Sequence, residues 1–176
     1  MIDAMRTVVV GDPPAPLAEW LQRRRALGQD LFDEVWEGDY HVAPAPHRRH
    51  GDVDDQLAAL LRPIARDRGL WPSGPANIGE PDDYRVPDRV YFHGRDPAAF
   101  EPTAALVVEI LSPVDETYDK LDFYARRGVE EVLVVDPERA SVAWYRRQGD
   151  TMERVSDSRV LRLSDDDVAA AVDWPS

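Results

Sequence analysis

The sequence predicts one α/β domain, in which helices flank a mixed β-sheet and a β-hairpin lies toward each end. Three observations predict this class. Residues 106–111 are apolar on both faces, as in a central strand that is covered on both sides. A long helical period runs over 48–68. Alternating segments with turn residues lie at 31–42 and 141–155, so a mixed sheet is favoured over a doubly wound parallel one.

The N-terminal part predicts little regular structure before residue 17. Three prolines near the end of residues 1–16 predict a flexible leader or an edge strand around 8–10. Apolar residues at helical spacing then predict a short helix that ends near Gly28. Residues 31–42 alternate around Glu37-Gly38-Asp39, whose glycine and acidic residues are typical of a hairpin turn.

The central part predicts one long helix and three short strands. Apolar positions recur at helical spacing over 48–68 despite Pro63, and Gly69 ends the helix. The short segments that follow are rich in β-branched or aromatic residues. They are predicted as strands at 76–79, 86–92 and 106–111.

The C-terminal part predicts a second helix, a buried strand, a hairpin and a last helix. The second helix covers 115–127 and stops at Gly128, and the buried strand covers 131–135. The hairpin joins 141–145 to 152–155, and a small helix covers 161–171. We therefore expect a single domain over 17–176.

Composition excludes several classes of function. The chain has 176 residues and a formal net charge of −13, which argues against a protein that coats nucleic acid by bulk electrostatics. It has no cysteine, so any metal must be held by oxygen or imidazole ligands. We find no apolar run near the length of a membrane span and no secretory leader, so we expect a soluble, cytoplasmic protein without a membrane partner.

Three residues in chain order suggest metal-assisted chemistry. Asp88 enters one predicted strand, Glu109 is the lone acid of the next, and Lys120 lies on the helix after it. Adjacent strands would bring the two carboxylates together. Magnesium usually binds through one or two carboxylates plus waters and phosphate. A cation so held polarises a phosphodiester and activates water.

Lys120 is the only lysine beside twenty arginines. Lysine can lose its proton on partial burial, whereas arginine cannot, so a need for proton transfer would explain why this lysine is kept. The alternative is an exposed helical lysine that pairs with Glu116, four residues earlier.

The combination of motifs resembles the Uma-type putative restriction endonuclease family of bacteria, within the PD-(D/E)XK nuclease superfamily. The resemblance spans about residues 31–145. It rests on short stretches that are specific only together, namely EVWEGDY at 34–40, the segment 44–50, VPDRV at 86–90, LVVEILSP at 106–113, DKLDFYARRGV at 119–129 and VLVVDP at 132–137.

The resemblance implies a restriction-endonuclease-like core with a catalytic set of Asp88, Glu109 and Lys120. The usual lysine position, two residues after the second acid, holds Leu111, and Lys120 matches the variant in which the lysine moves to the following helix. Glu34 matches the upstream acid, so Asp88, Glu109 and Glu34 would hold Mg²⁺ or Mn²⁺. His50 matches a histidine that would contact a phosphate or a water, although a capping or surface histidine is an equal alternative.

The leading hypothesis is a metal-dependent endonuclease that hydrolyses DNA phosphodiester bonds. The partner DNA comes from the resemblance and not from composition. Asp115, Glu116 and Asp119 depart from the family pattern before Lys120 and weaken phosphate binding there. Two alternatives stay open: a catalytically weak nuclease fold that binds or regulates, and a hydrolase of small phosphorylated molecules. By analogy with restriction-type folds we also expect a homodimer.

Overall fold

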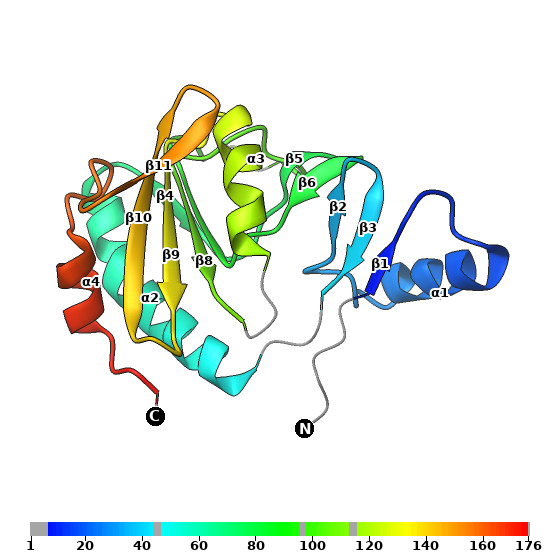
Figure 1. The fold of residues 1–176 in the computed structure, drawn as a ribbon, viewed down its shortest axis with the longest axis horizontal. Helices are drawn as coiled ribbons and strands as arrows, with labels where there is room; N and C mark the ends of the chain where they lie inside the picture. Colours follow the sequence, from blue (N-terminus) through cyan, green and yellow to red (C-terminus); the bar gives the residue numbers. More distant parts are fainter. Residues whose placement is uncertain (1–6, 44–46, 96–97, 113–115, 176) are drawn as a thin grey trace.

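The computed structural model describes residues 7–43, 47–95, 98–112 and 116–175. In these residues four α-helices and one short 3-10 helix accompany eleven strands (Figure 1). The helices are α1 (Ala15–Ala26), α2 (Arg48–Asp67), η1 (Thr117–Lys120), α3 (Leu121–Arg126) and α4 (Asp165–Ala171). The strands are β1 (Thr7–Val9), β2 (Glu34–Trp36), β3 (Asp39–Val42), β4 (Trp71–Ser73), β5 (Ile78–Glu80), β6 (Asp83–Arg85), β7 (Arg89–Phe92), β8 (Leu106–Ile110), β9 (Glu131–Asp136), β10 (Ser141–Gln148) and β11 (Thr151–Val155).

The strands form two sheets, a larger mixed one and a smaller antiparallel one. The larger sheet has the order β11-β10-β9-β8-β7-β4 and is mixed, because β8 and β9 run parallel whereas the other neighbours are antiparallel. The smaller sheet has the order β1-β3-β2-β6-β5 and is antiparallel throughout. The α/β class, the flanking helices and the hairpins toward both ends are as predicted.

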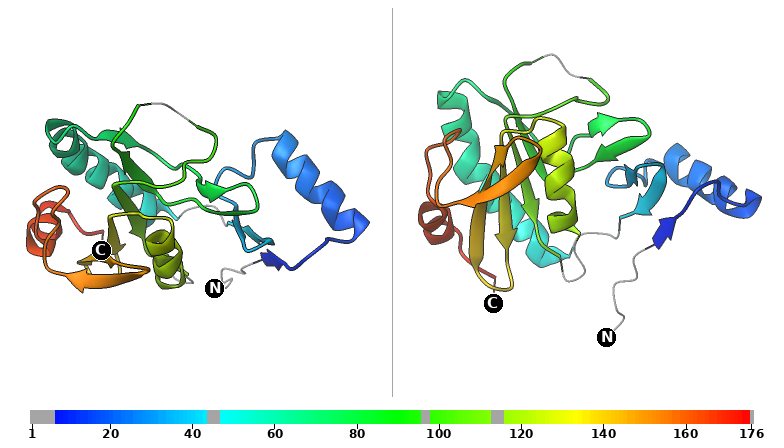
Figure 2. Two further views of the ribbon diagram at one scale, coloured as in Figure 1. Left: turned by 90° about the horizontal axis from the view of Figure 1, so that it is seen from above. Right: turned by 45° about the horizontal axis from the view of Figure 1, so that its top comes forward.

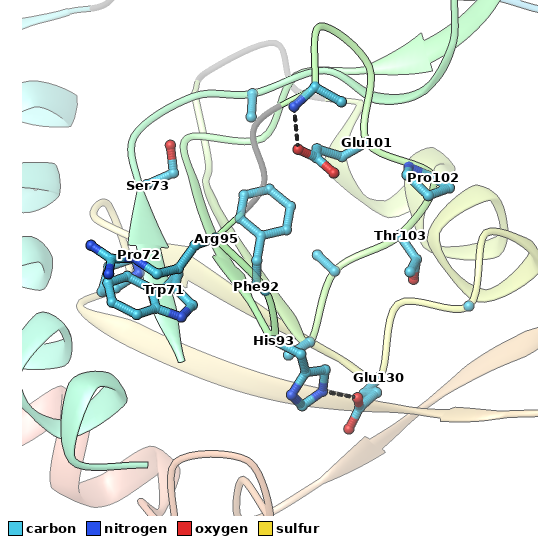
Figure 3. Close-up of a pocket in the computed structure, with 16 residues that line it drawn as sticks. Trp71, Pro72, Ser73, Phe92, His93, Arg95, Glu101, Pro102, Thr103 and Glu130 are labelled. Atoms are coloured by element: carbon cyan, nitrogen blue, oxygen red, sulfur yellow. Dashed lines mark hydrogen bonds and ion pairs between the residues drawn. The ribbon is translucent and has the colours of Figure 1, made fainter. Parts of the chain in front are cut away.

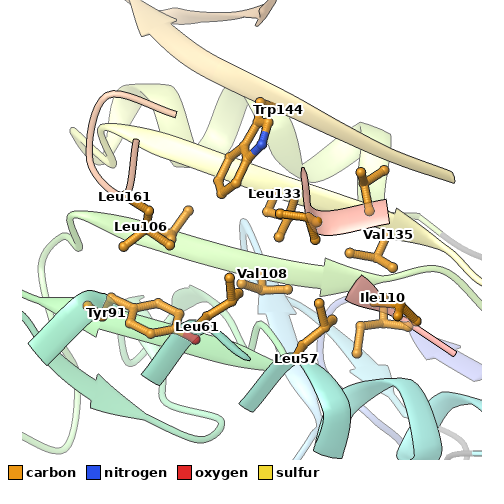
Figure 4. Close-up of a cluster of buried hydrophobic side chains, with 14 of the residues drawn as sticks. Leu57, Leu61, Tyr91, Leu106, Val108, Ile110, Leu133, Val135, Trp144 and Leu161 are labelled. Carbon is orange, nitrogen blue, oxygen red and sulfur yellow. The ribbon is translucent and has the colours of Figure 1, made fainter. Parts of the chain in front are cut away.

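The larger sheet is covered on both faces, which explains why β8 is apolar on both sides. Figure 2 shows α2 and α3 on opposite sides of this sheet. On one face, Leu57 and Leu61 of α2 pack with Leu106 and Val108 of β8 (Figure 4). On the other face, Phe123, Tyr124 and their neighbours pack against Val107 and the facing residues of β9. Because alternate residues of a strand point to opposite faces, Glu109 lies on the α3 side with Val107.

The β2–β3 hairpin shows how local sequence determines a turn. Trp36 pairs with Asp39, so only Glu37 and Gly38 form the loop. Their φ angles are 50° and 95°, and a two-residue turn of type I′ needs positive φ at both positions. Gly38 meets this requirement without strain, and the predicted hairpin is therefore present with the predicted turn.

Several predicted boundaries shift. In the predicted leader, Thr7–Val9 form the edge strand β1 and α1 begins at Ala15, while residues 1–6 lie outside the described part. The predicted strand 86–92 begins at Arg89, and β4 and β6 were not predicted. The last helix begins at Asp165 because Ser164 and Asp167 form a capping box.

The predicted helix 115–127 is divided into η1 and α3, and residue 115 lies outside the described part. Within the described ranges, no helix is long and apolar enough to span a membrane. The division into a leader and one domain over 17–176 stays a prediction.

Candidate functional site

The register of two central strands brings Asp88 and Glu109 together. β7 and β8 are antiparallel, and Arg89 pairs with Val108, so the same register continued by one residue places Asp88 opposite Glu109. Residues directly opposite each other have Cβ atoms roughly 5 Å apart. The backbone N–H of Ile110 also donates to Asp88 Oδ2 at 2.7 Å, which fixes the end of β7 against β8. The meeting of these two acids follows from strand order alone.

Glu109 is a buried carboxylate, with only 4% of its surface exposed. The hydroxyl of Tyr124 donates to its Oε1, and Lys120 Nζ lies 3.3 Å from Oε1 and 3.4 Å from Oε2. Burial, together with the charges of Asp88 and Glu34, raises the pKa of Glu109 to about 8, although Lys120 and Tyr124 oppose the rise. This carboxyl group therefore holds its proton in a range where an exposed glutamate is ionised.

Lys120 lies where η1 passes into α3, and its side chain is only 12% exposed. Its Nζ donates to Glu34 Oε1 at 2.9 Å, besides the contacts with Glu109. The alternative of an exposed surface lysine is therefore wrong. Glu116, its expected partner in that alternative, has Oε2 3.3 Å from His41 Nδ1.

Glu34 comes from β2 of the smaller sheet and is 7% exposed. Its Oε1 accepts from the N–H of Val86 at 2.8 Å and from Lys120, and its Oε2 accepts from Trp36 Nε1 at 2.7 Å. Burial by itself would raise the pKa of Glu34, but the charge of Lys120 and these three hydrogen bonds outweigh it and hold the pKa below its ordinary value. Glu34 is therefore held as a carboxylate beside Lys120.

His50 lies in the first turn of α2, and its Nε2 is 2.8 Å from Asp88 Oδ1. The capping role belongs to His47, whose side chain accepts from the N–H of Arg49. The side chain of His50 is 15% exposed, so it is not a surface histidine either. It contacts a candidate site residue, while the predicted contact with a phosphate or water stays a prediction.

Two residues of the cluster were missed in the sequence. Tyr124 follows Lys120 by four residues and so lies on the same side of the helix, although an aromatic residue at this spacing usually only packs in the core. Trp36 follows Glu34 by two residues and so shares its face of β2. Both spacings were visible in the sequence, but the polar atom of each ring gained a role only from the fold.

A stack of flat side chains joins the smaller sheet to α3 beside this cluster. The rings of Trp36 and His41 are 4.4 Å apart at an interplanar angle of 14°. The guanidinium carbon of Arg85 lies 4.3 Å from the Trp36 ring centroid and 4.1 Å from that of Phe123. Arg85 also donates to the carbonyl of Val35 at 2.8 Å. The stack therefore fixes β2, and with it the position of Glu34.

The donor chemistry of the cluster suits a hard divalent cation held by two carboxylates. No group of three or more histidine, cysteine, aspartate or glutamate residues converges around an ion position, as far as the described residues go. Asp88 and Glu109 face each other, however, and magnesium usually needs only one or two carboxylates with waters and phosphate. The pKa of Glu109 is raised chiefly by burial, and a cation bound beside it would favour the charged form of its carboxyl group.

A cavity of about 500 Å³ lies elsewhere, at the opposite end of the same strands. Its lining includes Phe92 and His93, which end β7 and follow it, whereas Asp88 precedes β7. Figure 3 shows Arg95 over the ring of Trp71 and the His93–Glu130 pair at its rim. The cavity is therefore separate from the carboxylate cluster.

Comparisons with known proteins agree with the fold and with the resemblance. The model of the Uma2 family, described as "Putative restriction endonuclease", matches residues 18–170. The solved structure of a putative nuclease of DUF820 from Anabaena variabilis shares 20% identity with a TM-score of 0.64, over 79% of this chain and 90% of that one. That structure shows the same fold, and its nuclease description concerns that protein. No curated protein matches the chain. The match over most of the chain shows that this protein belongs to the Uma2 family.

Proposed function

We propose that this protein is a metal-dependent endonuclease that hydrolyses phosphodiester bonds of DNA. Membership of the Uma2 family supports a nuclease. The observation that carries the proposal is the cluster itself. The register of β7 and β8, continued by one residue, places Asp88 opposite Glu109, and the N–H of Ile110 donates to Asp88 at 2.7 Å. The ammonium group of Lys120 lies 3.3 Å from Glu109. Two acids and a largely buried amine are the groups that phosphodiester hydrolysis needs.

Each residue of the cluster has a role in this proposal. Asp88 and Glu109 would hold Mg²⁺ or Mn²⁺, whereas Glu34, which the sequence also predicted as a ligand, belongs to no three-residue ion site among the described residues and pairs with Lys120. The cation would polarise the phosphodiester and increase the acidity of water near it. Lys120 helps to activate the attacking water by accepting its proton at Nζ, or else it stabilises the negative charge that develops on the phosphate.

The supporting side chains act through the site residues. Tyr124 fixes Glu109 through its hydroxyl, and Trp36 fixes Glu34 through its indole N–H. His50 orients Asp88, and in this proposal it also contacts a phosphate oxygen or a water.

The direct test is cleavage of supercoiled plasmid and of duplex oligonucleotides with magnesium or manganese. Asp88→Ala and Lys120→Ala should each abolish detectable cleavage, because each removes a group that acts on the reacting atoms. Matched controls are Asp122→Ala and Arg126→Ala, which change exposed residues of α3 and should cleave normally. Circular dichroism establishes that every variant is folded. Absence of wild-type cleavage on all substrates, or equal cleavage by the Asp88 and Lys120 variants, would reject the proposal.

A second candidate is a nuclease-fold protein that binds or regulates without turnover. The ion pairs of Lys120 with Glu34 and Glu109 favour it, because the amine already neutralises part of the acidic cluster without a metal. Calorimetry that shows nucleic-acid binding without magnesium or manganese binding would support this candidate. Turnover of nucleotides but not of polymers would instead indicate a hydrolase of small phosphorylated molecules.

A further inference from the structure

The cavity beyond the end of β7 has the size and the lining of a small-molecule site. Its volume is about 500 Å³, and pockets that hold small ligands occupy about 300–1,000 Å³. Trp71 of β4 and Phe92 of β7 both line it, and these two residues pair with each other across the strands. Ala76 and Ala104 add small apolar side chains, and both pack with Phe92 in the apolar cluster on the α3 side of the sheet. This wall therefore suits a flat apolar group.

Two arginines without an acidic partner lie beside the same wall. The guanidinium carbon of Arg95, which lines the cavity, is 3.8 Å from the centroid of the Trp71 ring, and that of Arg66 is 4.1 Å from it. Both arginines are exposed, and neither forms an ion pair with any residue in the described ranges. Two like charges beside one ring repel each other, and an anion held by them would offset that repulsion. The cavity therefore also suits an anionic group, although the chain as a whole carries a net charge of −13.

The acidic side chains of the lining do not neutralise Arg95. Glu130 Oε1 lies 2.5 Å from His93 Nε2, and Glu101 Oε1 accepts from the N–H of Ala98 at 3.0 Å. Figure 3 shows both of these contacts apart from Arg95. The guanidinium group of Arg95 is therefore available to an anionic ligand.

We propose that this cavity binds a single nucleotide, with its base against the ring of Phe92 and its phosphate on the guanidinium group of Arg95. Bases stack on aromatic side chains, and arginine binds phosphate through two parallel hydrogen bonds. The hydroxyl groups of Ser73 and Thr103 also line the cavity and offer neutral donors and acceptors to the edge of the base. The nucleotide is either free or one unit of a nucleic-acid strand. The inference does not depend on cleavage, because the cavity is separate from the carboxylate cluster.

Calorimetric titration of the full chain with deoxyadenosine monophosphate tests the proposal. Chelator in the buffer keeps metal out of the carboxylate cluster, where a metal would hold a phosphate. The nucleotide should bind with a dissociation constant below about 1 mM, and Arg95→Ala should raise that constant at least about tenfold. Phe92→Leu keeps an apolar side chain but removes the ring, so it should also weaken binding. Arg23→Ala is the matched control, because it removes an exposed arginine on α1, and it should bind like wild type.

Three further probes separate the parts and the sources of the ligand. Deoxyadenosine and inorganic phosphate should each bind at least about tenfold more weakly than the nucleotide, and phosphate that binds as tightly as the nucleotide would overturn the proposal in favour of a simple anion site. Binding of a single-stranded oligonucleotide but not of the free nucleotide, with the same loss in Arg95→Ala, would assign the cavity to one unit of a strand. Absence of binding by both forms overturns the proposal, as does binding that Arg95→Ala and Phe92→Leu leave unchanged.

Thiol protection locates the bound nucleotide independently, because the chain has no cysteine. A Ser73→Cys variant should react with a maleimide several-fold more slowly when it is saturated with the nucleotide. Ser141→Cys, on an exposed residue of β10, should react at one rate with and without it. Equal rates for Ser73→Cys would place the nucleotide elsewhere and overturn the proposal. Asp88→Ala combined with Ser73→Cys should keep the protection, so failure of the proposed nuclease function and failure of this site are distinguishable.

Discussion

Replacing Glu109 by glutamine should remove a pH-dependent loss of stability that the wild type carries. Burial raises the folded-state pKa of Glu109 from an ordinary 4.5 to about 8. Because the folded pKa is raised, the contribution of this group to stability is complete below about pH 4.5 and is lost as the pH rises toward 8. Glutamine resembles the neutral acid at every pH, so the variant should keep this contribution to stability.

The magnitude follows from the gap between the two pKa values. Each unit of pKa difference corresponds to about 1.4 kcal/mol, so the gap sets an upper bound of about 5 kcal/mol. Coupling with Glu34 and Lys120 reduces it, and we expect about 2–5 kcal/mol. Ionisation of Glu34 does not contribute to this pH dependence above pH 5, because its pKa is lowered and its contribution to stability is lost only at more acidic pH. The variant should therefore gain stability relative to wild type between pH 5 and pH 9.

Urea unfolding with chelator present, followed by tryptophan fluorescence, measures this difference at pH values from 5 to 9. Glu153→Gln, an exposed position on β11, controls for the loss of one negative charge. The stability difference between Glu109→Gln and wild type should grow from pH 5 to about pH 8 and then level off, whereas the Glu153 variant should run parallel to wild type. A difference for Glu109→Gln that is the same at pH 5 and pH 9 would refute the reasoning from burial.

Three further results are expected. Lys120→Arg keeps the positive charge, but an arginine side chain cannot readily lose a proton, so the rate of cleavage should fall by at least about 100-fold. Full activity of this variant would show that Lys120 acts only through its charge. Trp36→Phe removes the indole N–H that donates to Glu34 and should lower the free energy of unfolding by about 1.5–3 kcal/mol. The exposed control Trp20→Phe should lower it by less than about 0.5 kcal/mol, and equal losses in the two variants would contradict a stabilising Trp36–Glu34 hydrogen bond. Leu57→Ala opens a cavity under the sheet and should cost about 2–5 kcal/mol in urea unfolding, so a loss below about 1 would contradict its place in the core.

The central part of the candidate site could be predicted from the sequence because its rules are local. A strand that is apolar on both faces except for Glu109 indicates burial of that acid, and the adjacent predicted strand places Asp88 beside it. The turn at Glu37 and Gly38 follows from their side chains in the same way. Lys120 was distinguished by composition, as the only lysine among twenty arginines.

Tertiary structure decided what these residues meet. Glu34 and Lys120 are 86 positions apart, and no period or motif spacing encodes a contact at that distance; only the docking of β2 beside α3 produces it. The same docking assigns the indole N–H of Trp36 to Glu34 and the hydroxyl of Tyr124 to Glu109. Periodicity reports which face of an element is buried, whereas the partner of a buried polar atom depends on the packing of elements distant in the chain. For that reason the sequence by itself determined that Glu109 is a buried acid and that Lys120 is the only lysine, whereas only the fold brings both into one cluster with Glu34.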